Sequence, residues 1–184
     1  MKRFALLFSL LVFGFTSIQA QKYFTRDGKV TFSSDTPIEK IEAHNQKATC
    51  VLNAADGRME FAILIKAFQF EKALMQEHFN ENYMESGTYP KATFKGQISN
   101  IEAIDFSKDG NYEVTVAGDM TIHGVTQAVS TTGNILVKDG KLSADATFET
   151  KPGDYDIKIP AVVRKNIAEI VQVTVAVDLA PFNK

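Results

Sequence analysis

The stretch that decides the fold is Tyr112–Ile122, YEVTVAGDMTI, in which apolar and polar side chains alternate along the chain. Its apolar side chains occupy even-numbered positions, and Glu113, Thr115, Asp119 and Thr121 occupy odd ones. An alternation with a period of two predicts a β-strand that has one buried face and one solvated face. The same alternation recurs over residues 59–67, 92–98, 142–149 and 171–179. The chain therefore consists mainly of half-buried strands.

Asp-Gly dipeptides lie between these strands and predict where the chain turns. They occur at Asp27-Gly28, Asp56-Gly57, Asp109-Gly110 and Asp139-Gly140. Both residue types accept the positive φ of a type I′ turn, so Asp-Gly between alternating segments is a strong hairpin signal. We expect an antiparallel meander.

About eight strands with short turns fit either a closed barrel or a two-sheet sandwich. Closure removes exposed strand edges, and this favours the barrel. A barrel of about eight strands is either filled by its own side chains or holds one slender ligand. The pattern continues without a change of composition, so the sequence predicts an all-β chain with a single antiparallel barrel domain over residues 21–184.

One segment, Phe68–Gly96, differs from the rest because it contains a helical pattern. Leu74, Met75, Phe79 and Tyr83 would share one side of a short amphipathic helix over residues 72–86. Gly87 and Pro90 follow as stop signals. A lone helix in an all-β chain is either a lid over a cavity or a plug under a core, and the sequence leaves both readings open.

The N-terminus has the pattern of a secretory signal peptide. Lys2 and Arg3 precede the apolar run Phe4–Phe15, and small residues lead to Ala20. The run is shorter than a membrane-spanning helix requires, and the residue after Ala20 is not a cysteine. We expect cleavage before Gln21, no stable membrane anchor, and a periplasmic or secreted location.

Composition narrows the class of function. The whole chain has 20 Lys and Arg against 22 Asp and Glu, a formal net charge of −2 at pH 7. This balance argues against nucleic-acid binding, which needs clustered cationic side chains. Cys50 is the single cysteine, so the chain forms no internal disulfide, and its apolar neighbours indicate a small buried hydrophobe.

Two motifs resemble the signatures of the YceI-like, polyisoprenoid-binding family. The first is Phe79–Met84 followed by Tyr89–Phe94, which reads as a helix running into a strand. The second is Gly118–Thr126, GDMTIHGVT, a strand running into a turn. The resemblance extends from about Lys29 to Leu179, but Gln76-Glu77 stands before His78 where many members have Arg-Asp. The region Lys151–Tyr155 also departs from the family pattern.

The resemblance implies an exported, lipocalin-like barrel that takes a long isoprenoid chain, such as that of a quinone, into its lumen. It also favours the lid over the plug. The side chains that would line such a lumen are apolar and face inward if the alternation is read correctly. They are Phe61, Ile63, Ile65, Phe70, Met75, Phe79, Tyr83, Phe94, Val114, Val116, Met120, Ile122, Val173 and Val175.

Neither a metal site nor an enzyme is expected. His44, His78 and His123 are spaced unlike any metal-binding pattern, and the chain has no nucleophile elbow and no phosphate loop. Asp119, Asp145 and Glu149 fall on the solvated faces of strands, where carboxylates serve solubility. Apart from a bound polyisoprenoid or quinone, no cofactor is expected.

Two function classes follow. The first is a carrier that binds an isoprenoid or another long-chain lipid without catalysis. The alternative is an exported barrel packed solid, acting as a protein-interaction or stress-related module, with an exposed apolar patch instead of a tunnel. An exported hydrolase is a third reading, and it would need His and carboxylate groups in one cleft. The sequence leaves ligand identity and a homodimer open.

Overall fold

A computed structural model of the chain describes residues 22–182. The predicted signal peptide, residues 1–20, lies outside this range. The described chain forms nine strands: β1 Lys22–Asp35, β2 Lys40–Asn53, β3 Arg58–Leu64, β4 Gln69–Phe70, β5 Lys91–Ile98, β6 Gly110–Ile122, β7 Val125–Lys138, β8 Lys141–Thr150 and β9 Val171–Pro181.

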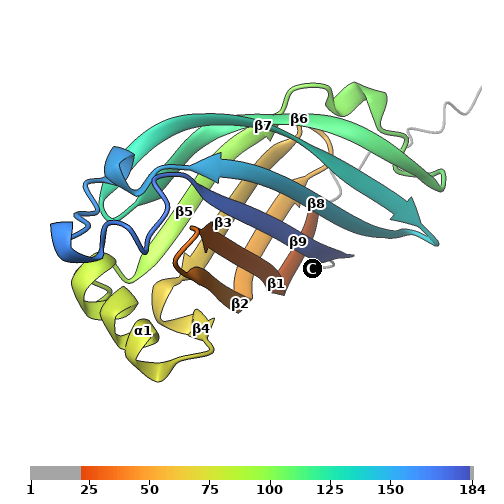
Figure 1. Cartoon of the computed structure of the whole chain (residues 1–184). Coiled ribbons are helices and arrows are strands. Elements are labelled where there is room, and N and C mark those ends of the chain that lie inside the picture. The colour runs from red at the N-terminus through yellow and green to blue at the C-terminus, as the bar shows by residue number, and fades with distance from the viewer. Residues whose placement is uncertain (1–21, 183–184) are drawn as a thin grey trace, which may run out of the picture.

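The strands close into an antiparallel barrel (Figure 1). Eight of them pair in the order β1-β9-β8-β7-β6-β5-β3-β2, and a further pairing of β1 with β2 completes the ring. The two-residue β4 pairs with β2 through Ala43 and Phe70, beyond the residues of β2 that pair with β3. This closed ring confirms the prediction of an all-β, antiparallel, eight-strand barrel. Because the ring is closed, no long strand of the described chain lies at an edge of the sheet.

Two of the four Asp-Gly dipeptides make hairpin turns. Asp139 and Gly140 join β7 to β8 with φ values of 50° and 71°, as a type I′ turn requires. Asp56 and Gly57 join β2 to β3 in a wider turn, in which only Gly57 has a positive φ, 73°. A further tight turn at His123 and Gly124 joins β6 to β7.

The other two dipeptides do not turn the chain, and the prediction there was wrong. Asp27-Gly28 lies inside β1, where the pairing register with β2 shifts on both sides of Gly28. A Cβ at Gly28 would lie 2.9 Å from Val177 Cγ1 and 3.0 Å from the Ala48 carbonyl oxygen, so this glycine permits a close approach at a bulge. Asp109-Gly110 opens β6 after a longer connection from β5.

The helical segment is short and changes its winding. Helix α1, Ala73–His78, continues directly into one turn of π-helix, Phe79–Tyr83. The helical segment ends at Tyr83, before the predicted stop signals Gly87 and Pro90. The predicted strand over residues 59–67 is also shorter than expected: β3 ends at Leu64, and Ile65 begins the 3₁₀ turn η1, Ile65–Ala67.

The barrel is packed solid at one end only. There, near the β2–β3 and β7–β8 turns, a buried cluster fills the interior. Leu52, Ile98 and Leu142 are among its most completely buried members, and the Tyr23 ring stacks on Phe106 at a centroid distance of 6.1 Å. Cys50 belongs to this cluster, and its burial raises the pKa of the thiol to about 12, which confirms the prediction of a small buried hydrophobe. We call this end the packed half.

Candidate functional site: an apolar cavity in the other half of the barrel

The opposite end, which carries α1, contains a cavity of about 610 Å³. We call this end the hollow half. Val114, Ile135 and Val177 belong to the packed cluster and also line the cavity, so they separate the two halves. Both interior arrangements that the sequence left open are therefore present in one barrel: side chains fill one half, and the other half is hollow.

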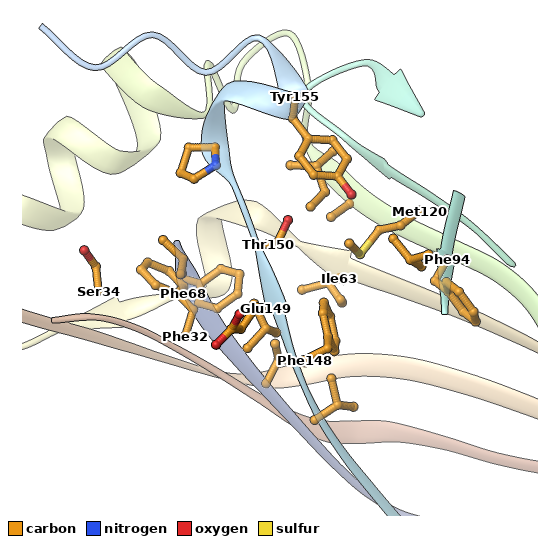
Figure 2. A pocket seen from close by; sticks show the side chains of 18 of the residues that line it. Phe32, Ser34, Ile63, Phe68, Phe94, Met120, Phe148, Glu149, Thr150 and Tyr155 are labelled. Atoms are coloured by element: carbon orange, nitrogen blue, oxygen red, sulfur yellow. The ribbon is translucent and has the colours of Figure 1, made fainter. Parts of the chain in front are cut away.

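All fourteen residues predicted to line a lumen are on the cavity wall: Phe61, Ile63, Ile65, Phe70, Met75, Phe79, Tyr83, Phe94, Val114, Val116, Met120, Ile122, Val173 and Val175. Figure 2 shows Ile63 and Phe148 beside the cavity, with Phe94 and Met120 on another part of the wall. Their contact with a ligand stays a prediction.

The helical segment is anchored over the cavity by an aromatic cluster. Phe79 packs against Phe32, Phe68 and Phe70, with ring centroids 5.0–5.5 Å apart. Met75 and Tyr83 also line the cavity, whereas Leu74 does not and is 61% exposed. Including Leu74 in the buried stripe was wrong, because the stripe follows Met75, Phe79 and Tyr83 alone.

A second cover was not predicted. The strap, residues 151–170, connects β8 to β9 through the 3₁₀ turns η4, Pro152–Tyr155, and η5, Ala161–Val163. It adds Pro152, Tyr155, Ile157, Ile159, Val163, Asn166 and Ile167 to the cavity wall. The strap has no regular period, so the only signal in its sequence is a series of spaced apolar residues.

Hydrogen bonds fasten the strap at both sides. The Ala168 amide donates to Ser34 Oγ at 2.8 Å, and Asn166 Nδ2 donates to Glu39 Oε2 at 3.1 Å. On the other side, Gln127 Nε2 donates to the Asp154 carbonyl at 2.8 Å, and His123 Nδ1 lies 3.1 Å from the Tyr155 carbonyl oxygen. The end of the barrel is thereby covered by α1 and the strap together.

The charged groups of the cavity wall are few and mostly acidic. Among the described residues, the wall includes the carboxylates of Glu39, Asp145 and Glu149 and the imidazole of His78, but no Lys or Arg. Hydrogen bonds from Asn166 and then Lys72 hold the pKa of Glu39 below its ordinary value. Burial raises the pKa of the Tyr155 phenol, which keeps this side chain uncharged. The wall therefore suits an apolar ligand without a negative charge.

The three histidines lie in different surroundings. His44 pairs with Glu42 and Thr31 on the outer surface, and His123 packs against Tyr89 near the strap. Within residues 22–182, no three His, Cys, Asp or Glu side chains are grouped as a metal ion would require. In the same range, no helix has the length and hydrophobicity needed to cross a bilayer.

Comparison with known proteins agrees with this geometry. A family model described as YceI-like domain matches residues 13–179. A polyisoprenoid binding domain from Saccharophagus degradans has a similar structure, with a TM-score of 0.77, 14% identity, and coverage of 89% of this chain and 99% of that one. BcnA from Burkholderia cenocepacia has a TM-score of 0.69 and 18% identity, over 83% of this chain and 96% of that one.

A YCEI protein of Campylobacter jejuni is also similar, with a TM-score of 0.52, 15% identity and full coverage of both chains. No curated protein sequence matches the chain. At these identities the solved structures establish a shared fold.

Proposed function

The chain belongs to the YceI-like domain family, and from this premise we propose that it binds one long-chain lipid, an isoprenoid such as a quinone, inside the hollow half of its barrel. The protein acts as a carrier or binding protein and catalyses no reaction. The observation that carries this proposal is a cavity of about 610 Å³ whose wall is mainly aliphatic and aromatic.

The energetics of such a cavity support an apolar occupant. Side chains around an empty apolar space lose dispersion contacts on that side, and a bound hydrocarbon restores them. Each CH₂ group moved from water into the cavity contributes about 0.8 kcal/mol, so a chain of several isoprene units binds without any specific hydrogen bond. The similar domain from Saccharophagus degradans is described as polyisoprenoid binding, which supports the same ligand class here.

The head of the ligand is uncharged in this proposal. Desolvating an anion is costly unless a cation compensates it. The described part of the wall offers carboxylates at Glu39, Asp145 and Glu149 and no Lys or Arg. A quinone or an alcohol meets these conditions, whereas a diphosphate or a fatty-acid carboxylate does not.

The proposal includes export. Residues 1–20 have the charged start, apolar run and small-residue end of a cleaved signal peptide, which would place the mature protein in a periplasm or outside the cell. Mass spectrometry of the mature N-terminus tests this part separately. An N-terminus at Gln21 supports it, and an intact Met1 in the exported protein contradicts it.

The decisive experiment is extraction and identification of lipid from natively purified protein. We expect native mass spectrometry to show one lipid per protein, with an apolar chain and a neutral head. Val175→Phe, which places a larger side chain on the cavity wall, is the matched control and should purify with less lipid. Wild-type protein that is free of lipid and also ignores added quinones would contradict the proposal.

The alternative, a barrel acting only through its surface, is less well supported. It predicts a filled interior, and the hollow half is not filled. The exposed large apolar side chains are distributed over different elements: Val162 and Ile38 lie in separate loops at the covered end, whereas Val51 and Leu136 lie on strands β2 and β7.

A further inference from the structure

The barrel wall is incompletely paired between β7 and β8. Their ladder runs from Lys138 and Lys141 to Gly133 and Ala146, and it stops there. Strand β7 begins eight residues earlier, at Val125, and β8 continues to Thr150. By contrast, the ladder between β6 and β7 continues to Ile122 and Val125. Figure 1 shows β7 and β8 diverging toward the end that carries α1. We call this unpaired stretch, residues 127–132 of β7 and 147–150 of β8, the seam.

The cavity extends into the seam. In β7 the inward positions are odd-numbered, since Val129, Thr131 and Gly133 pair with the inward residues of β6. In β8 the inward positions are even-numbered, among them Ala146 and Phe148. Outward residues of both strands also line the cavity: Ser130 and Glu149 within the seam, and the paired Asn134 and Asp145 just beyond its end. Because no ladder joins β7 to β8 beside these residues, the cavity borders the gap between the two strands.

The seam has defined limits. At the end nearer the packed half, Gly133 allows the two strands to meet, because a Cβ there would lie 2.5 Å from the Asp145 carbonyl oxygen. At the end nearer α1, the strap crosses over the seam, and the hydrogen bond from Gln127 to the Asp154 carbonyl fastens it there. Between these limits, the Thr131 hydroxyl donates to the Thr147 carbonyl over 3.4 Å, which is long for a hydrogen bond. The two strands are weakly connected across the seam.

The other routes into the cavity are closed more firmly. The packed half blocks one end of the barrel with a buried core. At the other end, Glu39 accepts hydrogen bonds from Asn166 of the strap and from Lys72 beside α1, and Ser34 accepts one from the Ala168 amide. Opening that end requires breaking these contacts and lifting Phe79 out of its aromatic cluster. Among the described residues, the long Thr131 contact is the one hydrogen bond that joins the two strands between the limits of the seam.

We propose that the seam between β7 and β8 is the portal through which the lipid enters and leaves the cavity. The inference rests on the proposed lipid-binding function and deepens it. The chain slides sideways between the strands while α1 and the strap stay in place. The hydroxyl groups of Ser130, Thr131 and Thr147 and the exposed backbone of the seam can receive the polar head during passage.

A reversible disulfide across the seam tests the portal. Continuing the register beyond Gly133 and Ala146 places Thr132 opposite Thr147, and neither residue lines the cavity. The test variant is Thr132→Cys with Thr147→Cys, oxidised or reduced. The matched control is Leu136→Cys with Ser143→Cys, because these residues are already paired in the ladder. The native Cys50 is fully buried and does not interfere. The ligand is retinol, an uncharged isoprenoid alcohol whose fluorescence reports binding.

The expected result is that oxidation of the seam variant slows both uptake and release of retinol about ten-fold or more, with little change in Kd. Reduction restores the wild-type rates, and oxidation of the control variant changes neither rate. A short bifunctional thiol reagent replaces the disulfide if the two cysteines do not join. Unchanged rates in a seam variant shown by mass spectrometry to be cross-linked would overturn the portal and leave lipid binding intact. Wild-type protein that binds neither retinol nor quinone would instead overturn the proposed function, and the portal with it.

Discussion

Asn166 of the strap donates a hydrogen bond to the carboxylate of Glu39 at 3.1 Å, although the two residues are 127 positions apart in the chain. The same carboxylate accepts a hydrogen bond from Lys72, just before α1. Glu39 therefore joins the two covers of the cavity to the β1–β2 hairpin.

This junction predicts a pH dependence of stability. The hydrogen bonds from Asn166 and Lys72 lower the pKa of Glu39, so its ionised form stabilises the folded state. A group with a lowered pKa contributes stability above its unfolded pKa and loses that contribution as the pH falls through its folded pKa. We expect Glu39→Gln to melt at a lower temperature than wild type at neutral pH, with the difference disappearing in acid. A constant difference at every pH would contradict the assignment.

The division into two halves predicts opposite effects for one substitution. Val175 lines the cavity, whereas Val137 is 1% exposed in the packed half. Val175→Phe should weaken retinol binding at little cost in stability, because the added ring extends into empty space. Val137→Phe should lower the free energy of unfolding by about 1–3 kcal/mol, since a filled core accepts no extra atoms. Chemical denaturation and fluorescence titration measure the two effects, and equal destabilisation would mean that the cavity is not open to side chains.

The two faces of the helical segment, residues 73–83, provide a similar pair. Phe79→Ala removes a ring that lines the cavity and joins the aromatic cluster, so we expect the Kd of retinol to rise about ten-fold. Leu74→Ala should change the free energy of unfolding by less than about 0.5 kcal/mol, because Leu74 is exposed. If Phe79→Ala destabilised the protein strongly and left Kd unchanged, the helix would be a plug and not a lid.

The acidic wall predicts selectivity for the charge of the ligand head. Retinol and retinoic acid share an isoprenoid skeleton and differ in their heads, an alcohol and a carboxylic acid that is ionised at neutral pH. At neutral pH we expect retinol to bind at least about ten-fold more tightly than retinoic acid, because the wall of the described chain offers carboxylates and no Lys or Arg. Acidification should narrow the gap as retinoic acid becomes neutral. Equal affinities at neutral pH would show that the head stays in solvent.

Strand faces were predictable because each depends on a period of two within one stretch. The inward positions of β3, β5, β6 and β9 follow from their own residues, and the fourteen predicted wall residues all lie at the cavity. The helical residues Met75, Phe79 and Tyr83 follow from helical spacing in the same way. Local patterns determine which side chains face inward.

Features that depend on distant contacts were not predictable. Asp27-Gly28 has the same two residues as the turn at Asp139-Gly140, but Gly28 meets Ala48 and Val177 from other strands and forms a bulge. The strap has no period, and its position depends on Ser34, Glu39 and Gln127. The acidic residues Asp145 and Glu149 were correctly placed on the outer face, yet their position beside the cavity depends on where the β7–β8 ladder ends.

The two-part interior also bears on how the sequence can change over evolutionary time. Several of the residues that exclude water most completely, such as Leu52, Ile98 and Leu142, do not line the cavity. Substitutions on the cavity wall can therefore alter which molecule is accepted while the cooperative unit that folds the chain stays intact. Single substitutions can therefore change the preferred ligand, and each intermediate sequence still folds.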